Sequence, residues 1–386
     1  MKYINRKLEK KIIRSAGTFP ALILTGPRRS GKTTLLQKLF PNAEYYLIES
    51  PDVVARIKHD PRSFLDEIRP PAILDEIQNV PEILNYLRSI IDNQPRKKGQ
   101  WMITGSQEAP LMRGVTESMA GRAATFQLFP FSLDETKKVS LFKGGFPEIL
   151  ERPSSHNIWF RSYIQTYLER DIRSISSIRD LSTFRRFLSL TTSRVGQMIN
   201  RSDIAVSLGV SVPTVTEWLN ILEITGQIIL IPPFFENFGK RLIKSSKLFL
   251  TDTGLACHLL GIQSEAELKR SPFYGPLFEN FIASEIIKHQ TNNGHKRSLY
   301  YFRDRFGLEV DFLIHHRENA ITLLEAKTSK TLRPSMGENI QKLKKNIKKY
   351  NTTSYIIHPT GKSKTPIKSI GANIKAIPLS SLHDII

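Results

Sequence analysis

One eight-residue stretch, GPRRSGKT at 26–33, constrains the fold of this 386-residue chain more than any other feature. It follows a short apolar run, ALILT at 21–25, that has the length and composition of a buried strand. A run with helical character, at 31–40, comes next and ends at Pro41. A glycine-rich loop between a strand and a helix turns backbone N–H groups toward one point, where the helix N-terminus adds positive potential. The sequence therefore predicts a phosphate-binding loop.

The loop fits the pattern G-x-x-x-x-G-K-[ST], in which the last two residues have defined roles. Lys32 is predicted to reach the β- and γ-phosphates of a nucleoside triphosphate, and the Thr33 hydroxyl to ligate Mg²⁺. The residues expected to contact the nucleotide are those of the loop and of the first helical turn: Gly26, Pro27, Arg28, Arg29, Ser30, Gly31, Lys32, Thr33 and Thr34.

A second apolar run, AILDE at 72–76, ends in two carboxylates. A buried strand that ends in this way needs a cation or polar chemistry beside it, because an unpaired buried charge is costly. Asp75 suits a contact to Mg²⁺ and to the nucleotide, and Glu76 suits the base that polarises the attacking water. A glutamate directly after the aspartate favours hydrolysis over binding alone.

Two further polar residues lie next to predicted strands. Ser106 ends the run QWMITGS at 100–106, where it could sense the γ-phosphate or simply begin a turn. Arg122 precedes the run AATFQLF at 123–129. It could act as an arginine finger on its own site or on that of a neighbouring chain, and a structural or surface role is the alternative.

Strands and helices alternate over the first part of the chain, which predicts a parallel sheet covered on both faces. The expected strands are at 21–26, 44–49, 71–76, 100–106 and 123–129, and helices are expected within 1–19 and at 31–40 and 81–92. Ser50-Pro51 and Asp60-Pro61 each place a capping side chain before a proline, so two short helices should follow. From about residue 131 the pattern becomes mostly helical up to about residue 195, with 144–150 and 163–175 as the clearest segments.

Residues 203–234 have the pattern of a helix–turn–helix followed by a β wing. Gly209 marks the turn and Ser211 the cap of the second helix, whose apolar positions are Val215, Leu219 and Leu222. Residues near the start of such a helix read base edges in DNA-binding modules. Both DNA binding and packing between domains are open roles for this module.

The distribution of charge in this module is unfavourable for DNA binding by its second helix. The second helix carries Glu217 and Glu223 and no Lys or Arg, which is unfavourable in a DNA groove. The wing carries four basic residues that could supply the positive charge instead: Lys240, Arg241, Lys244 and Lys247.

Near the end of the chain, LEVDFLIHHRENAITLLEAK at 308–327 predicts two strands joined by a turn. Side chains alternate between faces with period two, so a hairpin would bring Asp311 and Glu325 together, with Lys327 on the face of Glu325. Two carboxylates suit Mg²⁺, and the lysine could orient a metal-bound water or stabilise charge on a phosphodiester. Glu279, on a preceding helix at 275–290, is a further candidate ligand. A structural ion-pair network is the alternative.

The segments GPRRSGKT, ILDEIQ, ITGS, GRAATFQLFPFS, GGFPE and YLERDI, in this order, resemble a prokaryotic family of AAA-type ATP-binding proteins with a C-terminal domain of unknown function. The resemblance implies ATP as the nucleotide, an AAA-like domain, a winged-helix middle and a C-terminal domain similar to PD-(D/E)xK nucleases. The expected fold is α/β: a P-loop NTPase domain with a parallel sheet, a helical and winged-helix region, and an α/β restriction-endonuclease-like domain. The expected boundaries are 1–135, 136–195, 196–268 and 269–386.

The chain has a formal net charge of +20, and its last 60 residues hold twelve Lys or Arg against two acidic residues. A solvated lysine-rich helix explains part of this excess. Attraction to a polyanion is the sharper interpretation: nucleic acid first, DNA more than RNA, and an acidic membrane second. No apolar run approaches the roughly 18 residues of a membrane span. A single cysteine, Cys257, predicts a reducing cytoplasm.

Three functions are compatible with these features. The first is an ATPase that couples nucleotide state to nucleic-acid binding or processing. The second is a nucleotide-gated regulatory switch or scaffold whose nuclease-like domain is inactive. The third is a defence-type effector, in which the C-terminal domain cuts and the ATPase domain restrains it. A homo-oligomer or a protein partner is compatible with all three.

Overall fold

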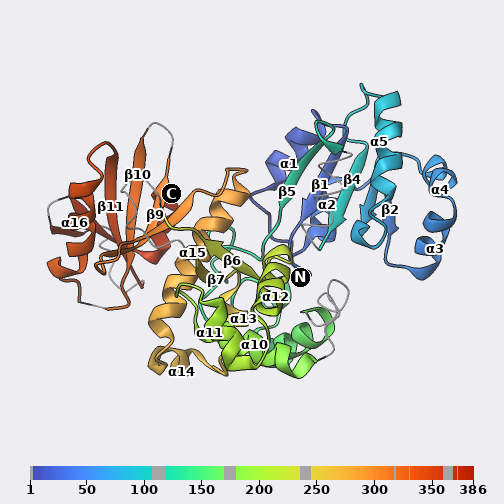
Figure 1. Ribbon diagram of the computed structural model, residues 1–386. Coiled ribbons are helices and arrows are strands. Elements are labelled where there is room, and N and C mark those ends of the chain that lie inside the picture. The colour runs from blue at the N-terminus through green and yellow to red at the C-terminus, as the bar shows by residue number, and fades with distance from the viewer. Residues whose placement is uncertain are drawn as a thin grey trace. The chain divides into compact units, whose positions relative to one another are not determined.

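The computed structural model describes residues 3–106, 119–168, 180–234, 245–316, 319–329, 331–359, 368–371 and 373–386. The chain divides into two compact units, which can be followed by colour along the chain in Figure 1. The N-terminal unit consists of Met1–Phe131 with Ile224–Gln227 and Thr291–His295. The C-terminal unit consists of Ser132–Glu223, Ile228–Gln290 and Lys296–Ile386.

A five-stranded parallel sheet forms the centre of the N-terminal unit. Its order is β2-β3-β4-β1-β5, with the strands β1 (Ala21–Thr25), β2 (Glu44–Leu47), β3 (Ala72–Asp75), β4 (Trp101–Gly105) and β5 (Ala123–Gln127). Strand β1 is buried along its whole length, whereas the edge strand β2 alternates between half-buried and exposed residues. The continuous apolar runs in the sequence therefore reflect strands that are covered on both faces.

Helices pack on the two faces of this sheet (Figure 1). On one face Leu22 and Leu24 of β1 pack with residues of α1 (Glu9–Ala16) and α2 (Lys32–Leu39). On the other face Ile23 packs in a cluster with residues of α3 (Pro51–His59), α4 (Pro61–Glu67) and α5 (Ile83–Asn93). Alternate side chains of β1 thus pack into two separate hydrophobic clusters, one on each face of the sheet, as expected for a pleated strand.

The predicted strands and helices of this unit are confirmed, with differences at their ends. The N-terminal helix is shorter than the range 1–19, and α5 begins at Ile83. Of the two predicted caps, Asp60 accepts hydrogen bonds from the backbone N–H groups of Arg62 and Ser63, but the side chain of Ser50 makes no capping hydrogen bond.

The first part of the C-terminal unit is helical, as predicted. It contains α7 (Pro147–Glu151), α8 (His156–Tyr163), a π-helical turn (Ile164–Leu168) and α10 (Leu181–Ser193). The end of the segment predicted at 163–175 lies outside the described residues.

Two helices and a strand pair follow, in the order predicted for residues 203–234. Helices α11 (Arg201–Leu208) and α12 (Val212–Ile224) meet at 109°, and Gly209 between them has φ 69°. This geometry is that of a helix–turn–helix. Val215, Leu219 and Leu222 are buried, and the Ser211 hydroxyl accepts a hydrogen bond from the Thr214 N–H, as expected. Strands β6 (Ile228–Ile231) and β7 (Lys247–Leu250) pair antiparallel.

The last part of the C-terminal unit is built on a mixed sheet of six strands, in the order β12-β13-β11-β10-β9-β8. Strands β8 (Leu299–Arg303), β9 (Glu309–His315) and β10 (Ala320–Ala326) pair antiparallel, and β11 (Asn351–His358) lies parallel to β10. The sequence pattern did not predict the two remaining strands, β12 (Lys368–Gly371) and β13 (Ile374–Pro378).

Several helices flank this sheet in the chain. Helices α13 (Thr253–Leu259), α14 (Glu265–Arg270) and α15 (Tyr274–Asn292) precede it. Helix α16 (Glu338–Asn346) lies between β10 and β11 in the chain, and a 3-10 helix (Leu379–Asp384) follows β13.

The predicted α/β class is confirmed, with a parallel P-loop sheet first and helical and mixed-sheet regions after it. Across the described residues, no single helix combines the length and the apolar character of a membrane span. Helices α11 and α12 would pass that test together, but the chain bends sharply between them.

Candidate functional site

The loop after β1 has a backbone that its glycines make possible. Gly26 has φ 134°, and a Cβ atom at this position would lie 2.2 Å from the backbone oxygen of Leu128. Gly31, with φ 97°, precedes the first residue of α2. A side chain at position 26 would push the loop away from β5, and the left-handed backbone at position 31 is one that L-residues rarely adopt. Both glycines of the motif are therefore required by the geometry.

Lys32 is buried with its ammonium group turned back over the loop. Its side chain is 4% exposed, and Nζ donates to the backbone oxygens of Gly26 and Pro27 at 3.0 and 3.1 Å. The hydroxyl of Ser30 is fully buried and has no hydrogen-bond partner within the described part of the chain. A buried ammonium and an unsatisfied hydroxyl in one loop fit the phosphates of a nucleotide.

Asp75 ends β3 beside this loop, as the sequence predicts. The Thr33 hydroxyl donates to its Oδ2 at 2.7 Å, and the Thr104 hydroxyl donates to Oδ1. The Tyr45 hydroxyl also donates to Oδ2, at 2.8 Å. Thr33 and Asp75, the two predicted Mg²⁺ contacts, are thus brought together. The oxygens of these two side chains are the kind of ligand that Mg²⁺ prefers.

Glu76 follows directly in a left-handed conformation, with φ 60°. Its backbone N–H donates to the Thr104 hydroxyl at 3.2 Å. The side-chain amide of Gln78 donates both to the Glu76 carboxylate and to the Ser106 hydroxyl, the latter at 3.2 Å. The amide therefore connects the predicted base to the predicted γ-phosphate sensor, both of which lie at the carboxyl edge of the sheet.

The electrostatics of this edge keep Glu76 ionised. Burial on its own raises the pKa of the Glu76 carboxyl, but the charges of Lys32 and Arg28 outweigh it, and the pKa lies below the ordinary value. The Arg28 guanidinium is 3.9 Å from the Glu76 carboxylate and 4.0 Å from that of Glu49. An ionised carboxylate at this position can accept a proton.

Three residues of this site were not found from the sequence. Gln78 lies two positions after Glu76, and Thr104 two positions before Ser106, so both follow from the strand ends once those are located. Tyr45 lies on the edge strand β2, and no spacing rule connects it to Asp75. Burial, and then its hydrogen bond to Asp75, raises the pKa of the Tyr45 phenol, which therefore stays a donor.

Arg122 lies far from the phosphate loop of its own chain, on which an arginine finger acting in the same chain would have to act. Its backbone oxygen accepts a hydrogen bond from Ala21, at the start of β1, whereas the phosphate loop follows the other end of that strand. Five residues of strand separate the two ends, roughly 16 Å. The guanidinium instead forms a two-pronged pair with Asp92, through Nε at 2.5 Å and Nη2 at 2.9 Å. This position does not favour a catalytic role for Arg122 within its own chain, and its role, there or on a neighbouring chain, stays a prediction.

The C-terminal unit contains a second charged centre. The β9–β10 ladder pairs Phe312 with Leu324, which places Asp311 opposite Glu325 at its end. The Asp311 carboxylate accepts the backbone N–H of Ala326 at 2.8 Å, and the Lys327 ammonium is 2.6 Å from the carboxylate of Glu325. The predicted convergence of Asp311, Glu325 and Lys327 is confirmed.

A lysine from outside this hairpin joins the centre. Lys247 of β7 is 3% exposed, and its ammonium lies 3.0 Å from Glu279 of α15 and 2.6 Å from Glu309 of β9. The sequence assigned Lys247 to the basic surface of the wing, which is wrong because its charge is buried among carboxylates. The other three wing residues, Lys240, Arg241 and Lys244, lie outside the described residues.

The lysines and the carboxylates of this centre shift one another's pKa. Burial, and then the charge of Asp311, raises the pKa of both Glu279 and Glu325. Lys247 acts in the opposite direction on Glu279, and Lys327 on Glu325, but the pKa of each carboxyl stays above its ordinary value.

Among the described residues, no group of three or more His, Cys, Asp or Glu side chains is arranged to hold a metal ion. Metal binding by Asp311, Glu325 and Glu279 stays a prediction.

Comparison with protein families matches three successive segments of the chain. Residues 18–137 match the model of an AAA domain. Residues 135–266 and 274–382 match two domains of unknown function, DUF8612 and DUF4143. The first match covers the sheet, the phosphate loop and Asp75 and Glu76, so this part of the chain is similar to an AAA domain and has an ATPase-like P-loop.

Among curated proteins, the chain is similar to the uncharacterized proteins Rv2008c of Mycobacterium tuberculosis and Mb2031c of Mycobacterium bovis. Each is 29% identical over 317 residues, which cover 80% of this chain and 70% of the relative.

Among solved structures, a Walker-type ATPase of Pyrococcus abyssi is 17% identical with a TM-score of 0.42, and covers 66% of this chain and 94% of its own. AMPPCP-bound DnaA of Aquifex aeolicus is 12% identical with a TM-score of 0.29, over 56% of this chain and 85% of its own. The similarity of the N-terminal unit to an AAA domain rests on the domain match and on the geometry of its loop and sheet.

Proposed function

We propose that this chain is a Mg²⁺-dependent ATPase whose nucleotide state controls the binding or processing of nucleic acid. The observation that supports hydrolysis most directly is the arrangement at the carboxyl edge of the parallel sheet. A buried lysine, a hydroxyl hydrogen-bonded to a buried aspartate and an ionised glutamate lie there, on the segments that follow β1 and end β3: Lys32, Thr33, Asp75 and Glu76.

Each of these groups has a defined task in the proposed reaction. The loop amides and Lys32 hold the phosphates, and Thr33 and Asp75 are the residues that would hold Mg²⁺, which supplies positive charge beside the transferred phosphoryl group. Glu76 orients a water molecule and accepts its proton at the carboxylate. The water oxygen bonds to the γ-phosphorus, and the bond to the β–γ bridging oxygen breaks, which gives ADP and inorganic phosphate.

The nucleic-acid part of the proposal is supported by the C-terminal unit. Helices α11 and α12 with strands β6 and β7 have the order and the crossing angle of a winged helix–turn–helix. The order of α15, β8, β9, β10, α16 and β11 is that expected of a PD-(D/E)xK nuclease-like core, with Asp311, Glu325 and Lys327 at one strand end. The net charge of +20 favours a polyanionic partner.

The ATPase proposal is tested by phosphate release from ATP with the purified full chain, over a Mg²⁺ titration with and without EDTA. Lys32→Ala should abolish turnover, and Lys98→Ala, an exposed lysine of the same unit, should leave it unchanged. Turnover that survives both EDTA and Lys32→Ala would show that the site does not hydrolyse ATP as proposed.

A second candidate is the nucleotide-gated switch with an inactive nuclease-like domain. One observation favours it: Lys247 and Lys327 already pair with the carboxylates that a metal would need. Incubation with Mg²⁺ or Mn²⁺ and linear, circular or single-stranded DNA, with and without ATP, separates the two candidates. Cleavage that is lost in Lys327→Ala supports processing. The absence of cleavage by the wild type, together with ATP-dependent DNA binding, supports the switch.

A further inference from the structure

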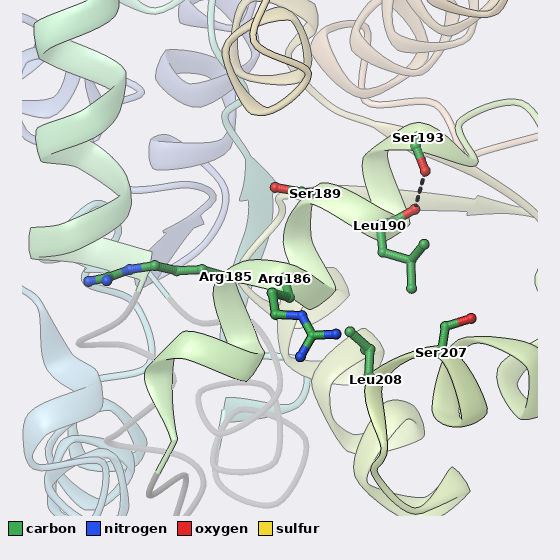
Figure 2. Close-up of a pocket in the computed structure, with 7 residues that line it drawn as sticks. All are labelled: Arg185, Arg186, Ser189, Leu190, Ser193, Ser207 and Leu208. Atoms are coloured by element: carbon green, nitrogen blue, oxygen red, sulfur yellow. Dashed lines mark hydrogen bonds between the residues drawn. The ribbon is translucent and has the colours of Figure 1, made fainter.

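The C-terminal unit has an open groove of about 540 Å³ between α10 and α11 (Figure 2). Figure 2 shows that its two arginines, Arg185 and Arg186, leave the same helical turn in different directions. The hydroxyls of Ser193 and Ser207 donate to backbone oxygens of their own helices. The polar groups drawn there therefore do not converge on one point, and the groove indicates no particular ligand.

Polar side chains do converge in the N-terminal unit, on the segment that follows β3. A short 3-10 helix (Ile77–Asn79) comes directly after Glu76. Its first residue, Ile77, is fully buried in a hydrophobic cluster with residues of α5, which anchors the turn to the core. Its second and third residues, Gln78 and Asn79, each donate a hydrogen bond to Glu76. The turn therefore arranges its polar side chains around the glutamate that precedes it.

The backbone of Glu76 is fixed from both sides. Its N–H donates to the Thr104 hydroxyl at 3.2 Å, and its oxygen accepts the side-chain amide of Asn79 at 2.9 Å. The same amide donates to the backbone oxygen of Ile48, also at 2.9 Å. These bonds hold residue 76 in a left-handed backbone that a residue with a side chain rarely adopts. They do not determine where its carboxylate points.

Gln78 is the residue that holds the carboxylate. Its amide nitrogen donates to Oε2 of Glu76 and to the Ser106 hydroxyl, the latter at 3.2 Å. Its amide oxygen accepts the backbone N–H of Ser106 at 3.4 Å. Ser106 is 1% exposed and directly follows β4, so the amide is held by a fixed group at the edge of the sheet.

A neutral donor suits a carboxylate that must act as a base. Burial raises the pKa of the Glu76 carboxyl, but the side chains of Gln78 and Ser106 help the nearby cations to lower it below its ordinary value. An amide donates a hydrogen bond without adding charge, whereas an ammonium group at the same place would weaken the base. A carboxylate has two oxygens, and while the amide holds one of them, the other can receive the proton of a water molecule.

We propose that Gln78 is a positioning residue, whose amide turns the Glu76 carboxylate toward the water that attacks the γ-phosphorus. The proposal rests on the proposed ATPase function and adds to it a residue that acts through Glu76 rather than on the nucleotide. Ser106 fixes the amide in turn. Without Gln78, the carboxylate would keep its charge but could rotate away from the water, and small displacements of a reacting group slow a reaction strongly.

The experiment measures single-turnover hydrolysis of γ-labelled ATP with Mg²⁺, with the full chain in excess over ATP and at increasing chain concentration. Gln78→Leu removes the amide at nearly constant size. Gln78→Glu is a second variant, which keeps the length and polarity of the side chain but donates no hydrogen bond. The matched control is Gln94→Leu, at an exposed glutamine just after α5. Gln78→Leu is also combined with Glu76→Gln, which completes a double-mutant cycle.

The rate of hydrolysis at saturating concentration should fall by up to about 10²-fold in both Gln78 variants. The concentration that gives half of this rate should stay that of the wild type, because Lys32 and the loop are untouched. In the Glu76→Gln background, Gln78→Leu should cause no further loss, since the group that it positions is no longer a base. Gln94→Leu should behave as the wild type.

Three outcomes overturn the positioning role and leave the ATPase function in place. The first is a wild-type rate in both Gln78 variants. The second is a loss in Gln78→Leu that multiplies with that of Glu76→Gln, which would make the two residues independent. The third is a loss of ATP affinity as large as the loss of rate, which would show that the loop as a whole is disturbed. A wild type that hydrolyses no ATP with Mg²⁺ overturns the proposed function and the positioning role with it.

Discussion

Asp75 in the N-terminal unit and Glu279 in the C-terminal unit are both withdrawn from solvent, but different groups surround them. Three hydroxyls donate to the Asp75 carboxylate, those of Thr33, Tyr45 and Thr104. The Glu279 carboxylate faces the ammonium of Lys247, which also pairs with Glu309. Hydroxyl groups satisfy hydrogen bonds without cancelling charge, whereas a lysine cancels it.

This difference in the surrounding groups indicates which of the two centres can accept a ligand. In the first, the hydroxyls leave the charge of Asp75 in place beside a loop that attracts phosphate, so a cation between the two would complete it. In the second, two lysines already pair with the carboxylates, and a metal ion would have to compete with them. Removing a group should therefore impair chemistry in the first centre and stability in the second.

The largest effect is expected for Glu76→Gln. Glutamine keeps the shape of the side chain but cannot accept the proton of the attacking water, so ATP turnover should fall by about 10²–10⁴-fold. Nucleotide binding should stay close to that of the wild type, because Lys32 and the loop are untouched. Turnover and binding of a fluorescent ATP analogue are measured in parallel. Wild-type turnover in Glu76→Gln would remove Glu76 from the mechanism.

Lys247→Met tests the second centre. Removal of the lysine takes the counter-charge from Glu279, whereas Glu309 keeps its ion pair with Arg303 at 3.1 Å. Breaking a buried pair costs about 3–5 kcal/mol. Hydrogen exchange of the amides in β9 and β10 reports this loss. The matched variant Lys247→Met/Glu279→Gln should recover part of it, since the charge left without a partner is gone. Equal protection in wild type and Lys247→Met would show that the ion pair does not hold the centre together.

Arg28→Ala tests how far the Arg28 charge lowers the pKa of Glu76 in the first centre. The Arg28 charge helps to hold the pKa of Glu76 below its ordinary value despite burial, so its removal should raise that pKa. A base must be ionised to act. The acid limb of turnover at saturating ATP should therefore move to higher pH in the variant, while Arg56→Ala, a solvent-exposed arginine of α3, should leave it in place. An acid limb that stays put in Arg28→Ala contradicts this assignment.

Tyr45→Phe removes one of the three hydroxyls from Asp75 and nothing else. A single hydrogen bond to a charged group contributes about 1.5–3 kcal/mol, and the lower end is expected because Thr33 and Thr104 remain. The consequence should be a modest loss of thermal stability and a small rise in the Mg²⁺ concentration needed for turnover. Tyr46→Phe, whose hydroxyl contacts Glu44 instead, is the control. A large loss of turnover would give Tyr45 a catalytic task.

The smallest effect is expected for Arg122→Ala. The guanidinium pairs with Asp92 at the amino edge of the sheet, away from its own phosphate loop. ATP turnover measured at low protein concentration should be that of the wild type. A loss that appears only as the concentration rises would reveal a role on a neighbouring chain.

Much of the first centre was predictable because parallel strands end at one edge. Once the runs before Gly26, Asp75 and Ser106 were recognised as strands, their final residues had to converge. The meeting of Asp311 and Glu325 followed in the same way from period two and a tight turn. The position of Arg122 at the opposite edge was also contained in the strand direction, since it precedes its strand.

The remaining features depend on tertiary packing that local patterns do not encode. Lys247 begins a four-residue strand whose residues are all buried. The strand therefore has no alternation of buried and exposed residues from which the direction of the Lys247 side chain could be predicted. Tyr45 reaches Asp75 from an edge strand whose neighbour is known only from the sheet order. Strands β12 and β13 are four and five residues long, which is too short for a period to stand out.

Strand β7 also limits how the chain can be dissected. Besides the Lys247 pairs, the Asn280 side chain accepts the backbone N–H of Leu250 and donates to its oxygen, and Ser284 donates to the oxygen of Thr251. A fragment that begins at the expected boundary of residue 269 would strip these partners from α15 and leave its buried polar groups facing water or one another. Expression of the C-terminal mixed-sheet region on its own should therefore start upstream of Lys247.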